Sequence, residues 1–120
     1  MTFEGMSFKT QLTLVHEGGQ TWRLVAPLHC SWRGGSVTVP QGFATDLASI
    51  PRLLRWVIPG VGDWNRPSVV HDYLYVHPGD WTRREADRLF LAGLEAEDVG
   101  RLKRWAMYAA VRVGGGVLWG

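Results

Sequence analysis

The chain has 120 residues, of which 46% are apolar and 20% charged, and it contains a single cysteine, Cys30. This length suits one domain with its own core, and the composition excludes a disordered chain, a disulfide framework and a cysteine-rich zinc fold. With 13 basic and 11 acidic residues the net charge is only +2, which does not by itself indicate nucleic-acid binding.

The pattern of residues 1–45 predicts β-strands. Extended patterns cover residues 8–15 and 22–28, and Gly18-Gly19 between them is typical of a turn. A second glycine pair, Gly34-Gly35, precedes the β-branched segment 36–39. We therefore expect a small antiparallel β-meander.

Residues 49–114 predict three or four helices. Ser49 can cap a short helix that ends before Pro59, and Pro67 opens a second helix that ends at Tyr75 or Val76. No segment is long and apolar enough to predict a membrane span.

Thr82 and Glu85 have the spacing of a capping box, and an apolar stripe follows them as far as residue 94. Asp98 is the expected cap of the last helix. The residues of that helix expected to face the core are Leu102, Ala106, Ala109, Ala110 and Val113. The pattern as a whole predicts one α+β domain over residues 1–120, with strands first and helices after them.

His71 is the first candidate for chemistry. On the predicted helix, His71, Asp72 and Tyr75 share one arc, while an apolar arc faces the other way. An imidazole beside carboxylates can act as a general base or bind a metal. The alternative is a surface histidine next to a solvated aspartate, and spacing does not decide between the two.

A second group of polar residues precedes the first predicted helix. Thr45, Asp46 and Ser49 can bind free backbone amides as a capping cluster, or Asp46 can bind a metal or orient His71. Asp87, at the border of the later apolar stripe, can point toward His71 or pair with a neighbouring arginine, Arg83 or Arg84.

Other polar groups are weaker candidates. A metal triad of His71, His77 and Asp80 matches no zinc spacing. The arginines of the last helix can meet phosphate or an acidic partner, or form a solvated face; they are Arg101, Arg104 and Arg112. Cys30, within a strand pattern, is expected to be a buried bystander.

Three blocks of residues resemble a family of short proteins of unknown function from tailed bacteriophages and prophages. The blocks are Gly42-Phe43-x-Thr45-Asp46-x-Ala48-Ser49-Ile50-Pro51, His71-Asp72-x-Leu74-Tyr75 and Arg84-x-x-Asp87-x-x-Phe90. The resemblance implies a phage or prophage origin, synthesis in the host cytoplasm and, for a virion protein, association with the particle. It also implies that six residues of these blocks are the important ones, namely Thr45, Asp46, Ser49, His71, Asp72 and Asp87.

A fainter resemblance links His71-Asp72 and Tyr75 to the catalytic helix of secreted phospholipases A2. In those enzymes the histidine activates water and the aspartate helps to bind calcium. This chain lacks their cysteine framework and their glycine-rich calcium loop, so the likeness is at best convergent.

These observations lead to two main hypotheses, beside a third in which the arginines of the last helix bind nucleic acid or a host factor. The first is a small phage-encoded hydrolase of the cell envelope, assisted by one divalent metal ion (zinc, calcium or magnesium). Its catalytic residues would be His71, Asp72, Asp46 and Asp87, its metal ligands Asp46, His71 and Asp72, and its substrate-binding residues Thr45, Ser49 and Tyr75. The second is a non-catalytic tail or assembly protein that contacts other phage proteins and uses the same residues as a structural network.

Overall fold

The computed structural model describes residues 3–19, 21–45 and 65–119, so the helix predicted from Ser49 lies outside the described residues. Within these ranges, six short strands occupy the N-terminal part, and three α-helices and a 3-10 helix occupy the C-terminal part. The predicted α+β class is therefore confirmed.

The described strands form two antiparallel sheets, each with three strands. The first sheet has the order β1 (Ser7–Phe8), β4 (Leu28–Trp32) and β5 (Gly35–Val39). The second has the order β2 (Leu14–His16), β3 (Trp22–Leu24) and β6 (Ala44–Thr45). The single meander that we expected is thus divided, because the segments 8–15 and 22–28 each break and contribute to both sheets.

The hairpin of β4 and β5 shows why one face of its sheet is buried. Leu28 lies opposite Val39 and Cys30 opposite Val37, and all four side chains are buried. Side chains alternate between the two faces of a strand, so the residues between these pairs lie on the other face. The apolar face packs toward the helices.

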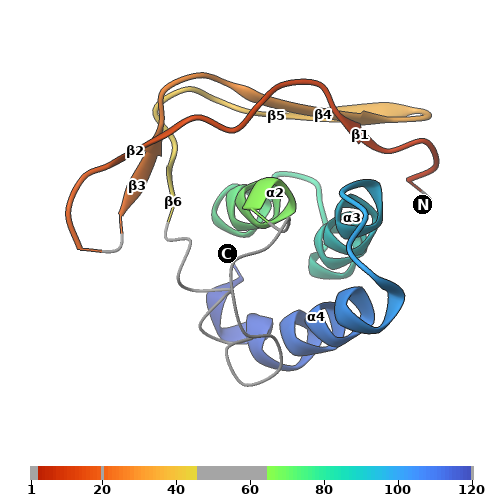
Figure 1. Ribbon diagram of the computed structural model, residues 1–120. Helices are drawn as coiled ribbons and strands as arrows, with labels where there is room; N and C mark the ends of the chain where they lie inside the picture. Colours follow the sequence, from red (N-terminus) through yellow and green to blue (C-terminus); the bar gives the residue numbers. More distant parts are fainter. Residues whose placement is uncertain (1–2, 20, 46–64, 120) are drawn as a thin grey trace.

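The helices are α2 (Asn65–Val76), α3 (Arg83–Ala96) and α4 (Arg101–Gly114), and the 3-10 helix is η1 (Gly115–Leu118). In Figure 1, the strands pass over α2 and α3, and α4 lies on the side of these helices away from the β1-β4-β5 sheet. A larger apolar cluster joins the strands to α2 and α3, and a smaller one joins α3 to α4. No helix in the described ranges is long and apolar enough to cross a membrane.

The beginning of α3 agrees with the predicted capping box. The backbone N–H of Glu85 donates to Thr82 Oγ1 at 3.1 Å, and the backbone N–H of Thr82 donates to Glu85 Oε1 at 2.9 Å. These two bonds satisfy backbone donors that the first turn leaves without helical partners.

Asp98 does not cap α4 as we expected, because it ends α3. Its φ of 61° lies in the left-handed region, and its N–H bonds to the carbonyl oxygen of Glu95. The N–H of Val99 bonds to the carbonyl oxygen of Leu94, and both side chains are buried in the smaller cluster. This arrangement is a Schellman motif, and the N-cap of α4 is Gly100.

Our prediction of the buried face of α4 is wrong for three of its residues, because Leu102, Val113 and the smaller Ala109 are exposed. Met107 and Val111 face the core, whereas Leu102 and Val113 are 88% and 89% exposed. At about 100° per residue, Leu102 and Val113 lie on the side of the helix opposite Met107 and Val111. Small alanines on both sides made the two faces hard to tell apart.

Candidate active site

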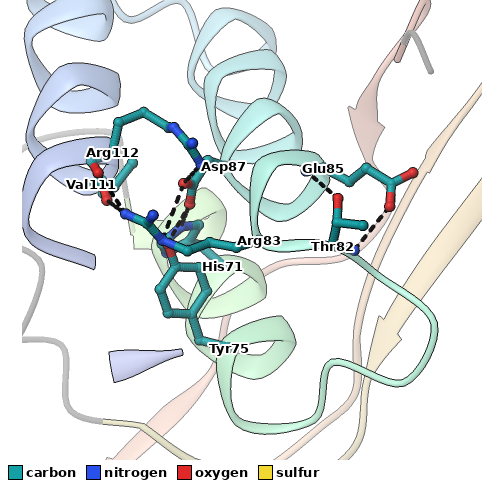
Figure 2. Close-up of polar contacts among 8 residues, drawn as sticks. All are labelled: His71, Tyr75, Thr82, Arg83, Glu85, Asp87, Val111 and Arg112. Atoms are coloured by element: carbon teal, nitrogen blue, oxygen red, sulfur yellow. Dashed lines mark hydrogen bonds and ion pairs between the residues drawn. The ribbon is translucent and has the colours of Figure 1, made fainter. Parts of the chain in front are cut away.

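The carboxylate of Asp87, on α3, is the centre of a polar cluster that joins α2, α3 and α4 (Figure 2). Its Oδ1 atom accepts hydrogen bonds from His71 Nε2 at 2.7 Å and from the Tyr75 hydroxyl at 2.5 Å. His71 and Tyr75 are four residues apart on α2, so helical periodicity brings both rings to the same side. The side chain of Asp87 therefore points toward His71, which is one of the two arrangements considered from the sequence.

Two arginines surround the other carboxylate oxygen of Asp87, Oδ2. Arg112 Nη1, from α4, donates to this atom at 2.8 Å, and Arg83 Nε lies 3.9 Å from it. Arg83 also donates to the Tyr75 hydroxyl at 3.3 Å and to the carbonyl oxygens of Val111 at 3.0 Å and Arg112 at 2.6 Å. The guanidinium of Arg83 therefore binds the C-terminal turn of α4 while it compensates the buried charge.

The charge states of the cluster follow from these contacts. Burial raises the pKa of the Asp87 carboxyl, but hydrogen bonds from His71, Tyr75 and Arg112 outweigh burial and hold the pKa below its ordinary value. Burial, together with the bond to the Asp87 carboxylate, raises the pKa of Tyr75 well above its ordinary value. At neutral pH, Asp87 is a carboxylate and Tyr75 is a protonated phenol.

His71 is buried, with 3% of its surface exposed, so its interpretation as a surface histidine is wrong. Because Asp87 is an acceptor, the Nε2 atom of His71 must carry the proton. In the neutral ring the lone pair is then on Nδ1, and no residue within the described ranges forms a hydrogen bond with that atom. A carboxylate bonded in this way fixes the tautomer and the orientation of the imidazole ring.

Asp72 follows His71 on α2 and is bound from the second sheet. Thr45 Oγ1, on β6, donates a hydrogen bond to Asp72 Oδ2 at 2.8 Å, and Thr45 is buried. The strand thereby connects the segment around residue 45 to the helix that carries His71. Two further predicted site residues, Asp46 and Ser49, lie outside the described residues.

In the part of the chain that the structure describes, no three His, Cys, Asp or Glu side chains are grouped so that they could hold a metal ion. His77 is exposed, and its ring contacts the rings of Phe43 and Tyr73. The metal set of Asp46, His71 and Asp72 includes a residue outside the described ranges and stays a prediction.

Sequence reasoning missed Arg112 as a member of the cluster. Its face of the last helix was interpreted as solvated or as a site for an acidic partner, but Arg112 reaches a carboxylate 25 residues earlier in the chain. The local sequence held no signal for this pair. Arg83 was easier to anticipate, because it precedes Asp87 by one helical turn.

Cys30, on β4, is 1% exposed, and burial raises the pKa of its thiol to about 11. The sulfur is thus protonated at neutral pH and is a poor nucleophile.

Comparison with known proteins identifies the family of this chain. No curated protein and no solved structure matches the chain at a significant level. A family model matches residues 22–111, a range that includes His71, Asp72, Tyr75, Asp87 and the two sheet segments that contact α2. The chain therefore belongs to the family described as a protein of unknown function, DUF1353.

Proposed function

We propose that the protein is a small hydrolase in which His71 activates a water molecule. The observation that carries this proposal is the buried pair of His71 and Asp87, with a 2.7 Å bond between Nε2 and the carboxylate. The bond fixes the ring so that Nδ1 presents its lone pair. A histidine held by a carboxylate is a common form of general base.

In the proposed reaction, Nδ1 of His71 removes a proton from water while the water oxygen bonds to an acyl carbon. The same proton then passes to the leaving oxygen or nitrogen as its bond to the acyl carbon breaks. Asp87 stabilises the imidazolium that exists between these steps, and it does not itself take up the proton. In this proposal Tyr75 holds the Asp87 carboxylate and does not bind substrate, because its hydroxyl donates to Asp87 and accepts from Arg83.

Asp72 would bind substrate or a divalent cation beside His71, together with Thr45 and with the predicted residues Asp46 and Ser49. A cation here would polarise the acyl oxygen. The likeness of the His71-Asp72 and Tyr75 spacing to phospholipases A2 supports the same division of labour between base and carboxylate. The resemblance to phage proteins supports a substrate in the bacterial envelope.

The second candidate is a non-catalytic virion or assembly protein. The observation that favours it is the burial of the cluster: His71 and Tyr75 are 3% exposed and Asp87 is 0% exposed. Networks of this kind can fix the relative positions of helices without any chemistry.

The two candidates differ in their response to His71→Gln, because the glutamine amide can donate to Asp87 but cannot act as a base. The probes are p-nitrophenyl acetate, phosphatidylglycerol vesicles and purified peptidoglycan. We expect His71→Gln to lower the hydrolysis rate at least about 100-fold while the melting temperature changes little.

His77→Gln is the matched control, since His77 is an exposed histidine just after the same helix, and we expect it to keep full activity. Dialysis against EDTA will lower the rate if a cation assists. Full activity in His71→Gln would overturn the hydrolase proposal. An inactive wild-type protein, with a large loss of stability in His71→Ala, would favour the structural candidate.

A further inference from the structure

Ser68 is a buried residue of α2 whose hydroxyl has no hydrogen-bond partner. It is 3% exposed, and within the described ranges its Oγ is the buried side-chain N or O atom that no donor or acceptor satisfies. Native proteins rarely keep such a group, because it has lost its water and gained no replacement. A buried hydroxyl without a protein partner is expected where a water molecule or another small polar ligand binds.

The position of Ser68 on α2 indicates which small ligand binds there. Ser68 precedes His71 by three residues and Asp72 by four, so the three side chains are neighbours on one side of α2. Side chains with these spacings have Cβ atoms about 5–6 Å apart. At that separation one small polar molecule can contact both side chains, and Ser68 Oγ forms no direct bond to a protein group in the described ranges.

The chemistry of the two neighbouring atoms is complementary to water. Nδ1 of His71 accepts a hydrogen bond, and no residue in the described part of the chain donates to it. The Ser68 hydroxyl can donate one. Bound between them, a water molecule would give one O–H to Nδ1, accept the hydroxyl proton of Ser68 in a hydrogen bond, and keep its second lone pair for an electrophile.

We infer that Ser68 Oγ and His71 Nδ1 bind the same water molecule, and that this is the water that His71 deprotonates. The inference rests on the proposed function. Ser68 would direct the attacking lone pair, and it would keep the water in place while the substrate enters. No bond to Ser68 forms or breaks in the reaction.

A buried serine with a purely structural role would behave differently from this site. The Ser68 hydroxyl forms no bond to another protein group in the described ranges, so Ser68→Ala should change the stability little in either case. Activity then separates the two roles, because a structural Ser68 has no effect on the water. We therefore expect Ser68→Ala to lower kcat about 10- to 100-fold, with KM, the pH profile and the melting temperature almost unchanged.

The control is Ser36→Ala, which removes the same hydroxyl from an exposed position on β5 and should leave kcat unchanged. A full kcat in Ser68→Ala, when His71→Gln is inactive, would overturn the inference and leave the proposed function intact. Activity in His71→Gln would overturn both. An acyl adduct on Ser68, detected by mass spectrometry with p-nitrophenyl acetate, would also overturn it, because the serine would then be the nucleophile.

A high-resolution crystal structure of the wild-type protein decides the question without any substrate. We expect one ordered water within hydrogen-bonding distance of both Ser68 Oγ and His71 Nδ1, and its loss or displacement in Ser68→Ala. Donation from Ser68 Oγ to a main-chain carbonyl, with no shared water at Nδ1, would overturn the inference.

Discussion

The two oxygens of the Asp87 carboxylate have different partners. Oδ1 accepts from two rings of α2, His71 and Tyr75, and Oδ2 interacts with the guanidinium groups of Arg83 and Arg112. A buried charge is costly to form and becomes more costly when any partner is removed. The residue that holds the proposed base is thus also a determinant of stability.

Asp87→Asn tests this dependence, because it keeps the shape of the side chain and removes the charge. We expect the free energy of unfolding to fall by about 3 kcal/mol, since Arg83 and Arg112 would lose the charge that compensates them. Urea unfolding measures the change. Asp80→Asn, at an exposed position, should change the free energy by less than about 0.5 kcal/mol; equal effects of the two substitutions would contradict the assigned role.

Helix periodicity was sufficient to place His71 and Tyr75 together and to suggest Asp87 as their partner, whereas Asp72 bonds to Thr45 on β6. It overestimated their exposure, because the arc that looked polar faces other polar side chains inside the protein. The contact between Arg112 and Asp87 depends on how α4 packs against α3, which no local pattern contains. Local spacing was therefore enough to identify the helix that carries the site. The pairing of Arg112 with the Asp87 carboxylate is determined by tertiary packing.

Among the secondary-structure elements, the connection between α3 and α4 departs most clearly from expectation. Asp98 followed by a helical pattern looked like an N-cap, but its backbone adopts φ 61° at the end of α3. The Schellman bonds and the buried contact of Val99 with Leu94 outweigh the strain of a left-handed residue with a side chain.

Asp98→Gly is accordingly expected to stabilise the protein by about 0.5–1 kcal/mol, because glycine adopts a positive φ without steric cost. Thermal unfolding will show the higher melting temperature. Asp80→Gly is the matched control: Asp80 is also exposed, but its φ is not positive, so the same substitution there should lower the melting temperature. A lower melting temperature for Asp98→Gly would contradict the cap assignment.

For the molecule as a whole, the sequence predicted the α+β class because the residue pattern changes from strand-like to helical after residue 45. The division into two sheets could not be predicted, because it depends on pairings between distant residues. Ser7 pairs with Ser31 across 24 positions, and Trp22 pairs with Thr45 across 23. Such non-local pairs leave little trace in a short window of sequence.

The polar cluster connects α2, α3 and α4, so its protonation should affect the stability of the entire helical part. The pKa of Asp87 is lower in the folded protein than its ordinary value of about 3.9. Its contribution to stability is therefore fully present above pH 4 and is lost as the pH falls through the lower, folded value.

We expect the melting temperature of the wild-type protein to fall more steeply below pH 4 than that of Asp87→Asn, which has no carboxyl to protonate there. Circular dichroism between pH 6 and pH 2 measures both curves. Parallel curves would show that protonation of Asp87 does not drive acid unfolding.

The burial of Cys30 makes the thiol a natural reporter of sheet opening. An alkylating reagent can modify this sulfur only in molecules where β4 has separated from its neighbours or from the helices beneath it. Its labelling rate under native conditions would therefore measure how often that opening occurs. Comparison of this rate with the loss of helical signal would show whether the strands and the helices separate as one unit.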